Sequence, residues 1–232
     1  VGLGIILIFT LGNLLDPSVR PLVMGATFGI ALTLVIIAGS ELFTGHTMFL
    51  TLGVKAGTIS QGQMWAILPQ TWVGNLLGSV FVALLYSWGG GGLLPVDTSL
   101  VHTVALAKTS QSAMALFFKG ALCNWLVCLA IWMAIRTEGA AKFIAIWWCL
   151  LAFIASGYEH SVANMTLFAL SWFGHHSDAY TLAGIGHNLL WVTLGNTLSG
   201  VVFMGLGYWY ATPQSERPAP EKIKQSEAAA NN

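Results

Sequence analysis

Long apolar runs with few charges constrain this chain more than any other feature. Several of the runs reach the ~20 residues that a helix needs to cross the hydrocarbon core of a bilayer. Only 8% of the residues are charged and the mean hydropathy is +0.73, whereas a soluble domain carries about 25% charged residues. The alternating ~10-residue segments of a membrane β-barrel do not occur. The sequence therefore predicts an all-α polytopic membrane protein that sits in a lipid bilayer. The net charge of zero gives no reason to expect a nucleic-acid partner.

Turn residues and short polar stretches divide the chain into six predicted spans. Their approximate bounds are 1–11, 21–52, 64–88, 112–135, 143–172 and 182–210. We expect a polar loop over residues 89–110. We also expect a single transmembrane domain over residues 1–210 and a disordered tail over 211–232. The first span is too short to cross alone, so we expect it to be incomplete at its N-terminus.

The basic residues favour one orientation. Six spans place both ends of the domain on one side, and the Lys and Arg residues on that side are Lys55, Arg136, Lys142, Arg217, Lys222 and Lys224. The opposite loops carry only Arg20 and Lys108. Because cytoplasmic loops are enriched in Lys and Arg, we expect a cytoplasmic C-terminus.

Two predicted spans are interrupted by polar sequence. The second contains GSELFTGH and the fifth contains SGYEHSVANM, and their acids Glu41 and Glu159 are 118 positions apart. GNLL at 74–77 and GNTL at 195–198 match at a similar offset of 121. This pattern predicts an inverted repeat of three spans, with broken second and fifth helices, as is typical of channels and secondary transporters.

Ionisable residues inside a membrane usually face a cavity or a partner, because burying a charge there is costly. Since Glu41 and Glu159 are equivalent, the simpler interpretation is that both satisfy the ends of broken helices. His160 has no counterpart in the first half, where Leu42 stands. An imidazole can exchange a proton near neutral pH, so His160 is the stronger functional candidate.

Other residues are less informative by themselves. Phe28, Leu32 and Phe153 precede the interruptions, and the sequence alone favours core or lipid contacts over an apolar constriction. The three cysteines lie in apolar runs without metal-ligand spacing, so we expect buried free thiols and no metal site. No cofactor is expected.

Four stretches together resemble the formate/nitrite transporter family: GSELFTGHTMFL, KGALCNWLVCLAIWM, SGYEHSVANM and GNTLSGVVFMG. The resemblance covers most of the chain from the second span to the sixth. It implies an aquaporin-like six-span fold with interrupted second and fifth spans. It also implies a homopentamer in which each protomer has its own pore. The family begins with an amphipathic helix and a full first span, which are incomplete or absent here.

The resemblance also assigns roles to individual residues. It places these side chains along the pore: His160, Thr44, Asn164, Asn124, Lys108 and Glu159. It makes Phe28, Leu32 and Phe153 the constriction, which reverses the interpretation of these residues from sequence alone.

The overall sequence is more similar to the nitrite channels of this family than to its formate channels. The expected function is therefore a channel or transporter for nitrite in the bacterial cytoplasmic (inner) membrane, and not an enzyme. We expect His160 to donate a proton or a hydrogen bond to the anion. A formate channel remains the alternative. A haem-binding oxidoreductase subunit is disfavoured because His46, His160 and His187 are dissimilarly placed. An aquaporin-type channel is disfavoured because paired Asn-Pro-Ala motifs are absent.

Overall fold

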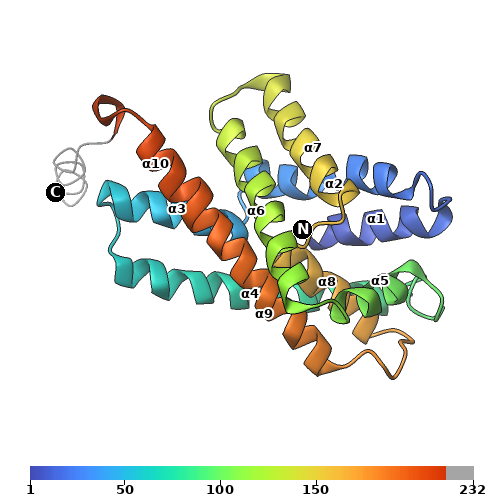
Figure 1. Cartoon of the computed structure of the whole chain (residues 1–232). Helices are drawn as coiled ribbons and strands as arrows, with labels where there is room; N and C mark the ends of the chain where they lie inside the picture. Colours follow the sequence, from blue (N-terminus) through green and yellow to red (C-terminus); the bar gives the residue numbers. More distant parts are fainter. Residues whose placement is uncertain (218–232) are drawn as a thin grey trace.

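The computed structural model describes residues 1–217, and these residues form helices and connecting segments without a strand (Figure 1). The helices, in chain order, are α1 (Gly2–Leu14), α2 (Arg20–Ala38), α3 (Phe43–Ala56), α4 (Gln61–Trp88), α5 (Leu100–Thr109), α6 (Ala113–Ala134), α7 (Gly139–Ala155), α8 (Ser161–Trp172), α9 (Leu182–Leu198), the π-helix η1 (Ser199–Leu206), α10 (Gly207–Ala211) and the 3₁₀ turn η2 (Gln214–Glu216). The predicted tail after residue 217 lies outside the described residues.

Four helical segments are long and apolar enough to cross a membrane: α2, α4, α6 and the continuous run α9–η1–α10. The shorter helices α1 and α7 are also apolar. Large apolar side chains cover the outer surface of α4, where Trp65, Leu77 and Phe81 are all more than half exposed. A water-soluble monomer rarely exposes so much contiguous apolar surface. The expected all-α membrane architecture is therefore confirmed at this level.

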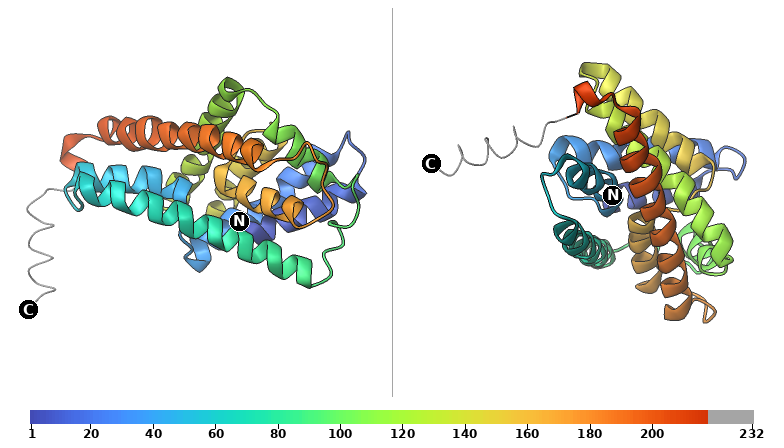
Figure 2. Two further views of the ribbon diagram at one scale, coloured as in Figure 1. Left: turned by 90° about the horizontal axis from the view of Figure 1, so that it is seen from below. Right: turned by 60° about the vertical axis from the view of Figure 1, so that its left-hand side comes forward.

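The long helices run along the molecule on either side of a short central helix. α4 and α9–η1–α10 flank α8, whose side chains are almost all buried (Figure 2). Glycines allow the closest helix approaches. A Cβ atom at Gly25 of α2 would lie 2.8 Å from the carbonyl oxygen of Leu151 in α7, and one at Gly195 of α9 would lie 2.0 Å from that of Phe117 in α6. Neither position has room for a larger residue.

The expectation of a loop throughout residues 89–110 was wrong. Residues 100–109 form α5, which is too short for the hydropathy of a span to reveal it. Val101 and Ala105, four positions apart on one face of α5, are completely buried. This helix carries Lys108 into the interior of the molecule.

Candidate functional site

Two short non-helical segments meet near the middle of the bundle. Residues 39–42 connect α2 to α3, and residues 156–160 connect α7 to α8. Gly39 and Gly157 adopt positive φ angles of 75° and 67°, which glycine does without the steric cost of a Cβ atom. The chain can therefore leave one helix and start the next within a few residues.

Two asparagines hold these two segments in the same way, each by hydrogen bonds to the connecting segment and to the start of the helix that follows it. The side chain of Asn75 in α4 accepts a hydrogen bond from the backbone N–H of Phe43 (2.9 Å) and donates one to the carbonyl of Glu41 (3.0 Å). Asn196 in α9 accepts from the N–H of Ser161 (2.9 Å) and donates to the carbonyl of Glu159 (3.1 Å). Each asparagine thus satisfies an orphan N–H at a helix start and a carbonyl two residues before it.

His160 occupies the N-cap position of α8. Its Nδ1 accepts a hydrogen bond from the backbone N–H of Ala163 (3.1 Å), and its Nε2 lies 3.1 Å from the hydroxyl oxygen of Thr44. Because a backbone N–H can only donate, Nδ1 carries no proton in this arrangement. The proton of the neutral imidazole is then on Nε2, and it is donated to Thr44. The ring stacks on Phe153 with a centroid distance of 5.9 Å.

Glu159 is adjacent to His160 in sequence, but its carboxylate contacts other residues than the imidazole does. It is 1% exposed, and one oxygen lies 2.8 Å from Lys108 Nζ. The same oxygen accepts from the amide of Asn164 (2.7 Å), and the other accepts from Gln111 (3.2 Å). Gln111 accepts in turn from Lys119 Nζ (2.7 Å). The buried carboxylate is therefore paired and hydrogen-bonded, as a buried charge has to be.

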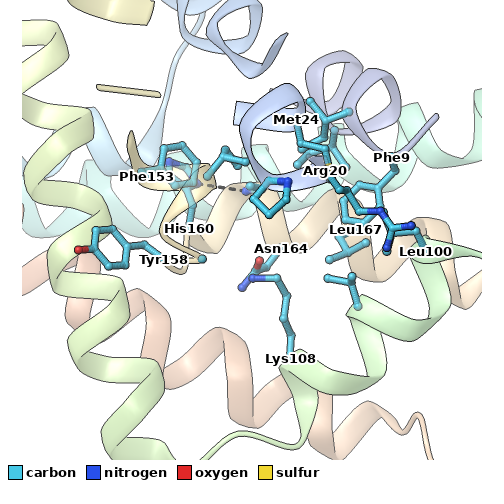
Figure 3. Close-up of a pocket in the computed structure, with 17 residues that line it drawn as sticks. Phe9, Arg20, Met24, Leu100, Lys108, Phe153, Tyr158, His160, Asn164 and Leu167 are labelled. Carbon is cyan, nitrogen blue, oxygen red and sulfur yellow. Dashed lines mark hydrogen bonds between the residues drawn. The ribbon is translucent and has the colours of Figure 1, made fainter. Parts of the chain in front are cut away.

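A cavity of about 220 Å³ brings several of the predicted residues together. Lys108, His160, Asn164 and Phe153 all line it, and Lys108 and Asn164 point toward one another beneath His160 (Figure 3). Most of the remaining lining is apolar and comes from α1, α2, α5 and α8. The cavity thus presents the imidazole, the amide and the paired ammonium of these residues on a mostly apolar wall.

Arg20 lines the same cavity, and the sequence analysis gave it no role at the site. Its Nη2 donates to the carbonyl of Leu15 (2.9 Å), whereas its buried Nε has no hydrogen-bond partner among the described residues. No carboxylate of residues 1–217 lies within ion-pair distance of its guanidinium. In contrast to Lys108, Arg20 brings an unpaired positive charge to the cavity. Its position near the end of the turn cluster GNLLDPSVRP, residues 12–21, was the only available signal.

The predicted constriction residues are buried, but they are not equally close to the cavity. The rings of Phe28 and Phe153 meet edge to face with a centroid distance of 5.6 Å. Phe153 lines the cavity, while Phe28 and Leu32 lie outside the cavity lining. An apolar contact therefore closes the cavity on the side of Phe153.

Asn124 lies outside the cavity and holds the backbone next to it by hydrogen bonds. Its amide donates to the carbonyls of Thr44 (3.2 Å) and Asn196 (2.7 Å) and approaches the hydroxyl of Thr47 (3.2 Å). It is fully buried and is not part of the cavity lining. The structure thus places Asn124 where it fixes the backbone of Thr44.

Glu41 and His46 form a second acid–imidazole pair next to the first connecting segment. His46 Nε2 contacts the carboxylate of Glu41, and Nδ1 lies 3.1 Å from the hydroxyl of Thr71. Glu41 and His46 are separated by the same number of positions as Glu159 and Asn164. The histidine therefore stands where the other half of the chain has its amide.

A bundle of apolar helices that encloses a small, mostly apolar cavity with a buried imidazole defines a helical membrane protein of the channel or transporter class. Within residues 1–217, no three His, Cys, Asp or Glu side chains are grouped so that they could hold a metal ion. The family model described as "Formate/nitrite transporter" matches residues 1–210. The chain belongs to the formate/nitrite transporter family.

Similar proteins agree with this assignment. "Nitrite transporter NirC" of Salmonella typhimurium (strain LT2) is 93% identical over 232 residues, which are 100% of this chain and 86% of the relative. A solved structure described as "FNT family ion channel" is 94% identical with a TM-score of 0.91, and the match covers 91% of this chain and 85% of that chain. A "Pentameric formate channel with formate bound" is 28% identical with a TM-score of 0.77, covering 90% and 92%.

Proposed function

We propose that the chain is a nitrite channel or transporter of a bacterial cytoplasmic membrane. The observation that carries this proposal is the cavity in which His160 faces an apolar wall together with Asn164 and Lys108. The Salmonella relative, a nitrite transporter by name, supports nitrite as the anion. We propose a homopentamer with one pore per protomer, in keeping with the similarity to the pentameric formate channel.

We propose that α2 and α3 are the two halves of one interrupted span, and that α7 and α8 are the halves of another. The equivalent hydrogen bonds of Asn75 and Asn196 support this arrangement and the inverted three-span repeat. Residues 1–210 then form one channel domain with six spans. The bias of Lys and Arg toward the end that holds Lys55 and Arg136 orients the C-terminus to the cytoplasm.

In this proposal the anion enters the cavity near Arg20. The charge of Lys108 is largely neutralised by Glu159 at 2.8 Å, so the unpaired guanidinium supplies most of the attraction. An anion that leaves water for an apolar contact loses several kcal/mol of solvation. The aromatic contact of Phe28 with Phe153 forms such a barrier beside His160.

His160 lowers this barrier by giving the anion a hydrogen bond or a proton. Nε2–H is the only donor on the neutral ring, because Nδ1 is occupied by the N–H of Ala163. Thr44 accepts that hydrogen in the absence of an anion, so the anion competes with a hydroxyl for it. To pass on a proton, the ring first takes up a second proton from water at Nδ1, which displaces the hydrogen bond from Ala163. Transfer from this imidazolium to nitrite then restores the neutral ring and yields neutral nitrous acid, which crosses an apolar constriction more easily than the ion does.

Flux measurements on purified protein in liposomes test this function. Nitrite, formate and chloride are supplied separately across a pH series. The proposal expects nitrite to be faster than formate, chloride to be slow, and nitrite flux to rise as the pH falls. A protein that moves formate faster than nitrite would be the formate channel of the same family.

A further inference from the structure

A second cavity lies at the opposite end of the helix α3 that begins beside Thr44. Its volume is about 340 Å³ and none of its lining residues belongs to the cavity of His160. α3 and α10 end side by side there (Figures 1 and 2). The lining residues that matter here are Leu52, Ala56, Trp132, Arg136, Trp209 and Arg217.

Two guanidinium groups line this cavity, those of Arg136 and Arg217. Arg136 stacks on Trp132, with its central carbon 4.0 Å from the ring centroid. Arg217 lies over Trp209 at 5.4 Å. Neither forms an ion pair with a carboxylate of residues 1–215. The indole rings hold both guanidinium groups in place by cation–π attraction, which does not use the N–H donors of the arginines.

Capping of helix ends explains only one of these arginines. Arg217 donates from Nε to the carbonyl of Thr212 (2.9 Å) and from Nη2 to that of Tyr210 (3.3 Å), close to the end of α10. Such contacts suit a cation at a helix C-terminus. The guanidinium of exposed Arg136 makes no hydrogen bond within the described part of the chain, although α6 ends two residues before it. Its N–H donors are therefore accessible to a ligand that enters the cavity.

The wall of the cavity has the character of an amphiphile's binding site. Leu52 and Ala56 of α3 provide an aliphatic side, the two indoles an aromatic side, and the arginines a cationic rim. Trp and Tyr side chains gather at the level of the membrane surface, and Trp132, Trp209, Tyr208 and Tyr210 all lie at this end. Basic pockets between helices at this level bind anionic lipid head groups.

We propose that this cavity binds the phosphate of an anionic phospholipid. Arg136 and Arg217 take the phosphate oxygens, since a guanidinium presents paired donors that match them. The glycerol and the first carbons of an acyl chain lie against Leu52 and Trp132. The bound lipid thereby bridges α3, α6 and α10. A free phosphate ion would offer the arginines the same chemistry but would leave the apolar wall uncovered.

Native mass spectrometry of the detergent-solubilised full-length chain tests the proposal. The protein is titrated with phosphatidylglycerol, with phosphatidylcholine of the same acyl chains, and with inorganic phosphate. The proposal expects phosphatidylglycerol to bind at least tenfold more tightly than phosphatidylcholine, and inorganic phosphate to bind weakly and without competing. The double variant Arg136→Gln/Arg217→Gln should lose this preference, whereas Arg136→Lys/Arg217→Lys should keep part of it.

Lys142→Gln is the matched control, because Lys142 is a half-buried cation at the same end that does not line the cavity. It should bind phosphatidylglycerol as the unaltered protein does. Equal binding of the two lipids, or an unchanged preference in the double glutamine variant, would overturn the proposal. Effective competition by inorganic phosphate would instead assign the cavity to a soluble anion and reject the lipid.

Discussion

Asn75 and Asn196 make the same two hydrogen bonds, each across the junction between two successive helices. In both cases the carbonyl that accepts belongs to a glutamate, and the N–H that donates belongs to the first residue of the next helix. Backbone groups at such junctions have no water to bind inside a bilayer, so a side chain has to satisfy them. The two asparagines are therefore structural supports for the two junctions, and the junction that Asn196 holds contains His160, which lines the cavity.

Replacing Asn196 with Ala should destabilise the protein strongly. The change leaves the N–H of Ser161 and the carbonyls of Glu159 and Gly120 without their partner, and each unsatisfied buried group costs about 1–3 kcal/mol. Asn75→Ala is the matched variant and should cost less, since Asn75 is only half-buried and its Nδ2 makes one bond. Thermal unfolding in detergent measures both. Equal losses would show that burial does not decide the cost.

Lys108→Met should destabilise more than the double variant Lys108→Met/Glu159→Gln. The single change leaves the carboxylate of Glu159 buried at 1% exposure without its cation, and removing one partner of a buried pair costs about 3–5 kcal/mol. The amide of the double variant is neutral and still accepts from Asn164. Denaturant unfolding of Lys108→Met, of Glu159→Gln and of the double variant gives the coupling free energy between the two side chains. Additive losses would mean that the ion pair contributes little.

The sequence was sufficient to predict the helical membrane architecture, because the spacing of charges and apolar runs depends little on tertiary detail. It also placed His160, Asn164 and Lys108 at one site, which the cavity brings together. The sequence did not predict the helix α5 or a role for Arg20 at the site. A ten-residue helix and a lone arginine produce no periodic pattern that could reveal them. Asn75 and Asn196 lay inside the matched GNLL and GNTL stretches, yet only the folded chain reveals their bonds.

Replacing Thr44 with Val should slow nitrite flux by about fivefold or more, whereas Thr44→Ser should stay close to the unaltered protein. Val removes the hydroxyl that lies 3.1 Å from His160 Nε2, so a buried donor loses its partner and the ring its orientation. Ser keeps the hydroxyl with a smaller side chain. Liposome flux at fixed pH compares them. If Val and Ser gave the same flux, the hydroxyl would have no part in transport.

Acidification should weaken the packing of α5 against α8. His102 is buried between Leu94, whose carbonyl accepts from Nε2 (3.1 Å), and Ser171, whose hydroxyl meets Nδ1 (2.9 Å). Burial lowers the pKa of His102 from its ordinary value of 6.5. The hydrogen bond to the Leu94 carbonyl and the charge of Asp97 oppose this effect, and His176 and His175 add to it. The folded state therefore favours the neutral ring.

The neutral His102 ring contributes its full stabilisation above the pKa of about 6.5 that histidine has in the unfolded chain. This contribution is lost progressively as the pH falls below that value. The melting temperature in detergent should decrease from pH 7.5 to pH 5.5, and His102→Gln should reduce this dependence. The exposed His175 is the control, and His175→Gln should keep most of the dependence, because His175 makes the smallest contribution to the lowered pKa of His102. A pH profile that is identical in the two variants would exclude His102 as its source.

The central claim is that His160 exchanges a proton with the anion during transport. His160→Asn separates this role from capping, because an Asn side chain can still accept the N–H of Ala163 at the start of α8. The decisive measurement is nitrite uptake by proteoliposomes with a pH indicator inside. The unaltered protein should acidify the interior as nitrite enters, and His160→Asn should remain folded while losing that acidification. Unchanged acidification in the variant would contradict the claim.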